Sequence, residues 1–169
     1  MMYLTSDTHF NHHNIIEYDQ RPFKDVEEMN ECLINNWNET VGETDIVYFL
    51  GDFGFGRPEE MKKIMQKLNG NICIVIGNHE VSMSKLTEIG FKAIANEITL
   101  NYKGIICVMS HEPIYAYKGE PGLLNFHGHT HSKDQFDKNL INVSCSAWDY
   151  KPIEINDLIL KHKKQKKRG

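Results

Sequence analysis

The feature that most constrains the fold of this chain is a set of five short polar motifs, each of which follows an apolar run. In chain order the motifs are Asp7-Thr8-His9, Gly51-Asp52, Gly77-Asn78-His79-Glu80, Ser110-His111 and Gly128-His129-Thr130-His131. Three of the preceding runs, 46–50, 72–76 and 105–109, have the length and composition of buried central strands. Open α/β folds place their sites outside the carboxyl ends of such strands. The pattern therefore predicts that the five motifs meet along one edge of a sheet.

Strands and helices alternate in the first half of the predicted order, whereas strands dominate the second half. Strands are expected at 2–6, 45–50, 71–76, 95–102, 105–110, 124–127, 140–144 and 152–155. Helices are expected at 25–40 behind an Asp25 capping box, from Pro58 to Gly70, near 83–89, and after an Asn156 cap. Segments 10–24 and 112–123 are expected to be irregular. This order favours an α/β sandwich with mixed sheets.

Length and composition describe one globular domain in a reducing compartment. The 169 residues suffice for a real core, and no apolar stretch reaches the length of a membrane span. The N-terminus shows no basic region followed by an apolar one, so no cleavable signal is expected, and cytosol is the default location. The cysteines lack CxxC spacing and are predicted to be small buried side chains: Cys32, Cys73, Cys107 and Cys145.

Charge is unevenly distributed along the chain. Removing the six positive charges of residues 161–169 from the net charge of −4 leaves −10 on residues 1–160. We therefore separate a domain, 1–160, from a basic tail, 161–169. The tail could contact nucleic acid, but the favoured interpretation is a solubilising helix end, where cations also suit the helix dipole.

The side chains of the motifs are suitable ligands for transition metals. Mixed His, Asp and Asn ligands suit manganese, iron or zinc better than an all-oxygen magnesium site. The absence of thiolates from the motifs argues against a closed structural zinc site. Gly51, Gly77 and Gly128 are expected to let the backbone turn sharply beside the ligands.

Taken together and in this order, the motifs resemble the calcineurin-like metallophosphoesterase superfamily over residues 3–155. The stretch 7–16 with Arg21-Pro22-Phe23 resembles a small single-domain bacterial and phage subgroup. This resemblance implies a sandwich of two mixed β-sheets flanked by helices.

The resemblance also implies a dinuclear centre of divalent metal ions, with manganese first and iron, zinc or nickel as alternatives. The implied ligands are Asp7, His9 and His131 for one ion, Asn78, His111 and His129 for the other, and Asp52 as the bridge. Two ions about 3.5–4 Å apart clamp a phosphate and lower the pKa of a bridging water, so that hydroxide attacks in line.

Four further residues are assigned roles near this centre. His79 follows a ligand but is not one in the pattern, so we expect it to protonate the leaving oxygen as general acid. Glu80 either steers that imidazole or caps the following helix. His12 either contacts phosphate or is a surface loop histidine, and Arg21 either clamps phosphate or packs and pairs locally.

Other ring-bearing residues are expected to be structural. His13, His127 and His162 are predicted to form ordinary hydrogen bonds. Trp148 and Tyr150 are predicted to be packing residues, with the alternative that either faces a ring of the substrate.

A metal-dependent phosphodiesterase is the first functional hypothesis, because a short chain without an inserted cap leaves room for two ester arms. A phosphomonoesterase or nucleotide pyrophosphatase would use the same metal core. The expected partner is a phosphoester, including nucleotide-derived ones. The other classes are a non-catalytic binding module, which would be expected to lose ligands, and a nuclease that uses the basic tail.

Overall fold

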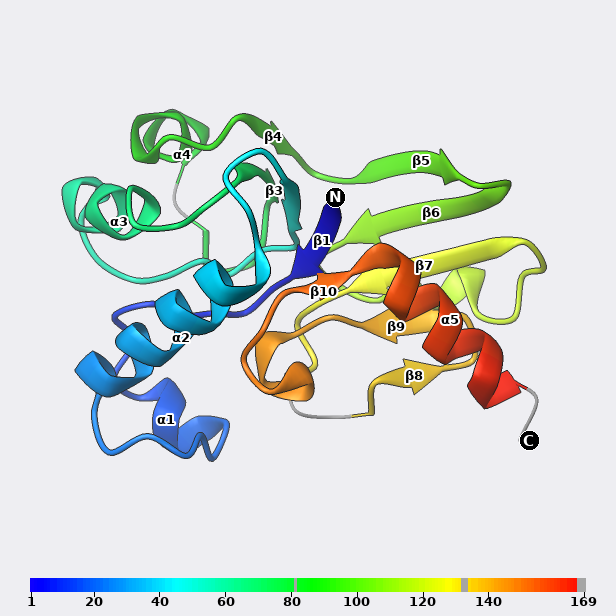
Figure 1. Ribbon diagram of the computed structural model, residues 1–169, viewed down its shortest axis with the longest axis horizontal. Coiled ribbons are helices and arrows are strands. Elements are labelled where there is room, and N and C mark those ends of the chain that lie inside the picture. Colours follow the sequence, from blue (N-terminus) through cyan, green and yellow to red (C-terminus); the bar gives the residue numbers. More distant parts are fainter. Residues whose placement is uncertain (81, 132–133, 167–169) are drawn as a thin grey trace.

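The structure is a computed structural model that describes residues 1–80, 82–131 and 134–166, without the side chain of Lys166. It contains two five-stranded sheets, which lie side by side in Figure 1. The first sheet has the order β10 (Ile153–Glu154), β1 (Met2–Thr5), β2 (Ile46–Phe49), β3 (Asn71–Val75) and β4 (Ala93–Ala95). The second has the order β5 (Ile98–Tyr102), β6 (Ile105–Ser110), β7 (Leu123–His127), β9 (Leu140–Asn142) and β8 (Phe136–Asp137).

Both sheets are mixed. Strands β1 to β4 are parallel, and only β10 is antiparallel to its neighbour. In the second sheet β6, β7 and β9 are parallel, and the edge strands β5 and β8 are antiparallel to them. The predicted sandwich of two mixed sheets is confirmed.

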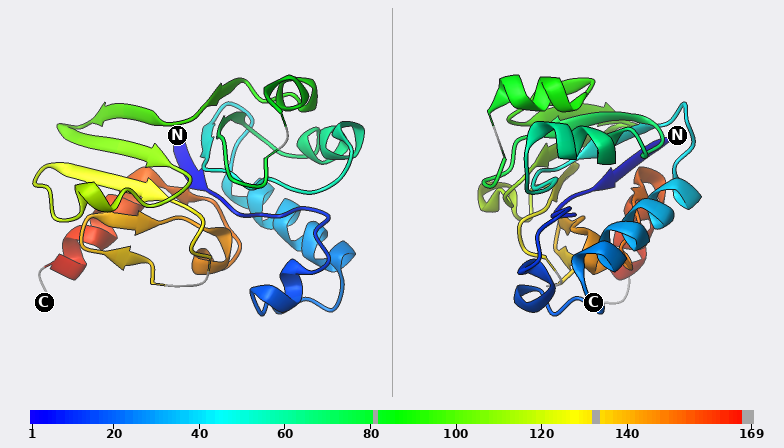
Figure 2. Two further views of the ribbon diagram at one scale, coloured as in Figure 1. Left: turned by 180° about the vertical axis from the view of Figure 1, so that it is seen from behind. Right: turned by 90° about the vertical axis from the view of Figure 1, so that its left-hand side faces the viewer.

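Helices flank the two sheets (Figure 2). They are α1 (Ile15–Tyr18), α2 (Val26–Thr40), α3 (Pro58–Met65), α4 (Met83–Ile89) and α5 (Ile155–Lys166), with short 3-10 helices η1 (Tyr115–Tyr117) and η2 (Cys145–Trp148). None of the helices among the described residues is both long and apolar enough to cross a bilayer.

The central strands of the first sheet are buried on both faces. In β2, Val47 and Phe49 pack in a cluster with α2, α3 and α4, whereas Tyr48 and the following Leu50 belong to a second cluster. That second cluster also contains strand residues of the other sheet and the apolar face of α5, including Leu158. Alternate residues therefore serve two cores, which explains why the sequence shows continuous apolar runs rather than polar alternation.

Several predicted elements are confirmed with small shifts of their ends. Helix α2 begins after Asp25, whose side chain accepts a hydrogen bond from the backbone N–H of Glu28. The Glu28 carboxylate accepts from the backbone N–H of Lys24, whereas a capping box would have it accept from that of Asp25. Helix α3 begins at Pro58 as expected and ends at Met65, before Gly70, whose φ of +93° turns the chain into β3.

Other expectations were wrong. Segment 10–24 contains α1, and the strand expected at 95–102 divides into β4 and β5, which belong to different sheets. Strand β8 was not predicted, and helix η1 lies within the segment 112–123. Asn156 does not cap α5, because the helix already begins at Ile155 and the Asn156 amide oxygen accepts from Tyr102 Oη and Lys103 Nζ.

The basic tail begins within a helix. Helix α5 continues across the predicted boundary between residues 160 and 161 and ends at Lys166. Within the tail, His162 is buried, and its Nε2 atom is 2.8 Å from the carbonyl oxygen of Lys138. This arrangement favours the helix-end interpretation as far as residue 166, while Lys167 and Arg168 lie outside the described residues. The four cysteines are free thiols, of which Cys107 and Cys145 are buried and the other two are half-buried.

Candidate metal centre

The predicted ligands follow the carboxyl ends of five strands drawn from both sheets. Strands β1, β2 and β3 lead to Asp7, Asp52 and Asn78. From the second sheet, β6 leads to His111, and β7 leads to His129 and His131. The ends of β6 and β7 point toward the middle of the molecule beside β1 (Figure 1). The two sheets thus bring together residues that are as many as 124 positions apart in the sequence.

Five of the seven predicted ligands have a left-handed backbone. Their φ angles are 56° for Asp7, 50° for His9, 61° for Asp52, 65° for His129 and 52° for His131. This region is uncommon for residues with a Cβ atom. Such strain persists where surrounding structure enforces it, and it concentrates at functional sites.

Two of the motif glycines are required for close approach rather than for a turn. A Cβ atom on Gly77 would overlap Oδ1 of Asp52, and one on Gly128 would overlap Ser6 and the Asp7 carboxylate. Gly51 does turn the chain, with φ of +92°, and a Cβ there would also press on the His111 ring. The expectation of sharp turns therefore holds for Gly51, whereas Gly77 and Gly128 allow backbone to lie against a ligand.

Asp52 lies between the two predicted sets of ligands. Its Oδ2 atom is 3.7 Å from Nε2 of His9 and 3.7 Å from Nε2 of His111. Its other oxygen, Oδ1, accepts the backbone N–H of His79 at 3.0 Å. One oxygen is therefore fixed by the protein, and the other is directed toward histidines of both sets.

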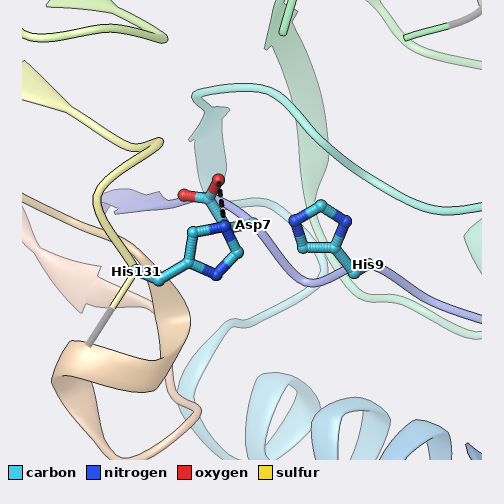
Figure 3. Close-up of side chains that lie close together, drawn as sticks. All are labelled: Asp7, His9 and His131. Atoms are coloured by element: carbon cyan, nitrogen blue, oxygen red, sulfur yellow. Dashed lines mark ion pairs between the residues drawn. The ribbon is translucent and has the colours of Figure 1, made fainter. Parts of the chain in front are cut away.

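Asp7, His9 and His131 form a compact group, in which one donor atom from each lies within 4.8 Å of the others. Figure 3 shows the three side chains, with Nε2 of His131 3.9 Å from Oδ1 of Asp7. Oδ2 of Asp7 is held by the hydroxyls of Ser6 and Ser144 at 2.5 and 2.8 Å. The carboxylate is thereby oriented toward the two imidazoles.

His9 provides a direct test of whether a cation fits here. Its side chain is 2% exposed, and neither ring nitrogen has a hydrogen-bond partner among the described residues. Burial, followed by the nearby charge of Arg21, lowers the pKa of His9 to about 2. A neutral, buried imidazole with a free lone pair is the form that binds a metal ion. Without a bound ion, burial would remove the hydrogen bonds of this ring to water and supply no interaction in their place.

A second group joins Asp7, Asp52 and His111, and it too has donor atoms within 4.8 Å of one another. Nδ1 of His111 is 2.8 Å from the carbonyl oxygen of Leu50, which can only accept a hydrogen bond. In a neutral ring Nε2 is then an acceptor, and it faces Oδ1 of Asn78 at 2.7 Å. Nδ1 of His129 is 3.2 Å from the same amide oxygen. Nε2 of His111 and the Asn78 amide oxygen thus direct lone pairs at each other, an arrangement that a cation between them would stabilise.

His79 lies beside these groups without belonging to either. Its side chain is exposed, and its ring centroid is 6.0 Å from that of His9 and 5.8 Å from that of Phe55. The ring lines a cavity of about 690 Å³ together with His9, His129 and His131. The ring of His79 therefore lies at the edge of the metal groups.

The same cavity extends along segment 12–20, where it is lined by His12, Ile15 and Tyr18, and it also reaches Tyr150. His12 is half-buried, and its ring stacks on Phe55 with centroids 4.1 Å apart. The side chain of Tyr18 is largely exposed, at 73%. The cavity thus combines the metal groups with an aromatic wall.

The two roles considered for Glu80 are both replaced by a third. Its Oε1 atom accepts the backbone N–H of Phe53 at 2.9 Å, so Glu80 braces the loop that carries Asp52. Burial raises the pKa of Glu80 to about 7. Helix α4 begins at Met83 after Ser82, outside the reach of a Glu80 cap.

Arg21 is not placed to clamp a phosphate. Its side chain has no exposed surface, and the guanidinium donates to the carbonyls of Asp7 and Thr8 and to the carboxylate of Asp19. This favours local packing and pairing, the alternative weighed for Arg21 above. Trp148 and His127 are also structural, since they bond Asn142 and Gly128.

Three residues near the centre were missed by the sequence reasoning: Ser6, Asp19 and Ser144. The hydroxyls of Ser6 and Ser144 hold the Asp7 carboxylate, and Asp19 contacts His131. Ser6 precedes a ligand and could have been considered from its position. Ser144 lies 137 residues from Asp7, and no local sequence pattern predicts that the two residues are in contact.

The sequence as a whole matches known proteins in a way that fits this geometry. The model of the calcineurin-like phosphoesterase family matches residues 2–168, and the chain belongs to this family. The family typically binds divalent metal ions, and the two ligand groups are candidates for such binding.

Two similar proteins have names that state no function. An uncharacterized protein of Methanocaldococcus jannaschii is 40% identical over 174 aligned positions, which cover 95% of this chain and 89% of that protein. The crystal structure of a protein of unknown function from Aquifex aeolicus has 27% identity and a TM-score of 0.75, covering 94% of this chain and 97% of that one. An archaeal phosphodiesterase is more distant, with 19% identity, a TM-score of 0.48 and coverage of 87% and 86%. At that distance the activity of one protein says nothing of the other's.

Proposed function

We propose that this protein is a metal-dependent phosphoesterase that acts on phosphodiesters. The observation that supports this most directly is the position of Asp52, whose Oδ2 atom is 3.7 Å from a histidine of each ligand group. A single carboxylate oxygen directed at two histidine sets suits a bridge between two cations and has little use in a site for one. Membership of the calcineurin-like phosphoesterase family supports hydrolysis of a phosphoester as the reaction.

The ligands for the proposed centre are those assigned by the resemblance: Asp7, His9 and His131 for one ion, Asn78, His111 and His129 for the other, with Asp52 shared. When bound, two divalent ions supply charge neutralisation of the phosphate and a lowered pKa for the attacking water. Imidazole, carboxylate and amide donors support manganese first, with iron, zinc or nickel as alternatives.

His79 is proposed as the general acid. Its backbone N–H is bound to Asp52, so its ring is kept at the edge of the metal groups, and its side chain is exposed to the cavity. From there the imidazolium can donate its proton to the departing alkoxide oxygen, which would otherwise leave as a strong base. The ring then returns to the imidazolium form by taking up a proton from solvent.

The cavity supports a diester rather than a monoester. Its volume of about 690 Å³ continues past the metal groups along segment 12–20, which gives the second ester arm a place to lie. The rings of Tyr18 and Tyr150 line that extension, and they suit an arm that carries a flat group, such as a nucleoside. A phosphomonoesterase or nucleotide pyrophosphatase would use the same metal groups and is the alternative.

The free thiols support a reducing compartment such as the cytosol.

Two remaining hypotheses are less well supported. A non-catalytic binding module would have no use for both ligand groups and His79 together. A nuclease that relies on the basic tail would need the charges of residues 161–169 to guide a polyanion. Removal of residues 161–169 should then weaken nucleic-acid binding and flatten its salt dependence.

Hydrolysis of two model substrates tests the proposal. The protein loaded with manganese should hydrolyse bis-p-nitrophenyl phosphate faster than p-nitrophenyl phosphate. Cleavage of the monoester alone would replace the diesterase by the monoesterase. Inactivity toward a broad panel of phosphoesters, in protein that holds its metal, would favour the binding module.

A further inference from the structure

A buried ion pair outside the predicted ligand set contacts the first ligand group. Arg21 and Asp19 have side chains that are 0% and 3% exposed, and Nε of Arg21 is 3.0 Å from Oδ2 of Asp19. A buried charged pair of this kind stabilises a protein only where the remaining donors and acceptors are also satisfied. The partners that satisfy them lie in the metal centre.

The guanidinium of Arg21 supports the loop that carries Asp7 and His9. Its Nη2 atom donates to the carbonyl oxygen of Asp7 at 2.7 Å, and its Nη1 atom donates to that of Thr8 at 2.8 Å. Asp7 and His9 both have a left-handed backbone, which is unfavourable without such support. Two carbonyl groups bound by one rigid, planar cation fix the orientation of the peptides between these ligands.

The carboxylate of Asp19 reaches the third ligand of the same group. Its Oδ2 atom, which receives Arg21, is also 3.3 Å from Nδ1 of His131. This contact has the distance of an ion pair, but Nδ1 of His131 makes no hydrogen bond among the described residues. The nearby negative charge favours a proton on Nδ1, which leaves the lone pair on Nε2, the atom nearer to Asp7.

The three ligands proposed for the second ion receive no such contact. Among the described residues, neither Arg21 nor Asp19 has a hydrogen bond or an ion pair with Asn78, His111 or His129. Instead, His111 is oriented by the carbonyl of Leu50. The direct contacts of the pair are therefore with ligands of the first site, and Asp7 links them to the other side, through the backbone N–H of His129.

We propose that Asp19 and Arg21 are positioning residues for the first metal site, the one formed by Asp7, His9 and His131. This inference rests on the proposed metal centre, and it adds that the two sites depend on different supporting residues. Arg21 acts through the backbone of Asp7 and Thr8, and Asp19 acts through the imidazole of His131. Loss of either residue should weaken the first site and spare the second.

Titration with Mn²⁺ alone, followed by calorimetry, tests this in the wild type and in Asp19→Asn. Replacing a residue that orients a ligand typically weakens metal binding by roughly 10–100-fold. We expect this loss at one of the two sites, with the other unchanged. Electron paramagnetic resonance should then show a coupled manganese pair in the wild type and a single uncoupled ion in the variant at matched metal concentration.

Two further variants sharpen the test. Asp137→Asn makes the same change in an exposed ion pair with Lys118, and it should leave both manganese sites intact. If Asp19→Asn does not fold, the double variant Asp19→Asn/Arg21→Gln removes both buried charges together and carries the same expectation. The ion retained in the second site shows that a variant is folded.

Four results are decisive. Wild-type affinity at both sites of Asp19→Asn, or an equal loss at both, would overturn the positioning role. A wild-type protein that binds one ion, and loses it in Asp19→Asn, would overturn the dinuclear centre while leaving the positioning role in place. A wild type that binds no manganese would end both.

Discussion

The backbone N–H of His79 donates a 3.0 Å hydrogen bond to Oδ1 of Asp52. This contact joins the proposed bridging ligand to the proposed general acid, although the residues come from the ends of different strands. It uses the oxygen of Asp52 that is not directed at His9 and His111. The position of His79 and the position of Asp52 are consequently fixed together. A substitution at His79 can remove its imidazole and still keep the backbone N–H that holds Asp52.

His79→Ala removes the imidazole but keeps the backbone N–H that holds Asp52. We expect metal content to be unchanged and turnover of diesters with alkyl leaving groups to fall by roughly 10²–10⁴-fold, the usual share of a general acid. A p-nitrophenolate leaving group needs little protonation, so the loss with bis-p-nitrophenyl phosphate should be much smaller. Equal losses for both substrates, or loss of metal, would mean that His79 has another role.

Gly77→Ala places a methyl group against Oδ1 of Asp52. Overpacking of this kind costs about 1–3 kcal/mol, and here the Asp52 carboxylate must move to relieve it. We expect manganese binding and activity to fall sharply, measured by metal analysis and steady-state kinetics. Gly104→Ala is the control, because in the described part of the chain only its own neighbours in sequence lie within 4 Å of the added Cβ. Its φ of +83° strains the backbone there, away from the metal groups. Normal metal binding by Gly77→Ala would contradict the tight fit of this backbone.

Tyr18→Ala removes an exposed ring from the cavity wall. An aromatic contact worth about 0.5–1.5 kcal/mol corresponds to a roughly two- to tenfold rise in KM, with kcat little changed. The rise should appear with bis-p-nitrophenyl phosphate and be absent with methyl p-nitrophenyl phosphate, if the ring contacts the second arm. Tyr115 is 66% exposed and does not line this cavity, so Tyr115→Ala should affect neither substrate. An identical KM in Tyr18→Ala for both diesters would remove the aromatic wall from substrate binding.

Removal of metal should lower the thermal stability of the protein, because the ligands converge only in the folded chain. Free metal at 100 times its dissociation constant stabilises a protein by about 2.7 kcal/mol, which corresponds to a Tm change of roughly 5–10 °C at this length. Calorimetry with and without a chelator measures the change, and readdition of manganese should restore it. A Tm that does not respond to either would show that the folded protein binds no metal under these conditions.

The fold and the gathering of the motifs were predictable because local signals carry them. The apolar runs before Asp52, Asn78 and His111 are long and are bounded by turn residues, and strands of this type share an edge. The structure brings the predicted ligands together as expected, while their binding of ions stays a prediction. The irregular element ends were less predictable, since α1 has only four residues and Ala93–Ala95 and Ile98–Tyr102 join different sheets without a strong breaker between them.

The supporting contacts of the site could not be read from the sequence. Ser144 reaches Asp7, and Asp19 reaches His131, through tertiary packing that brings distant segments together. Arg21 looked suited to a phosphate because its guanidinium is a good anion ligand, but the fold buries it against two carbonyls. Asn156 looked like a helix cap, but the Tyr102 hydroxyl and the Lys103 ammonium occupy its amide oxygen. In each case a long-range contact outweighed a local propensity.

Anomalous X-ray scattering from crystals of the manganese-loaded protein tests the central claim most directly. The account predicts two manganese peaks, one on each side of Oδ2 of Asp52, with His9 and His111 bound to different ions. One peak alone, or peaks that lie away from Asp52, would contradict it.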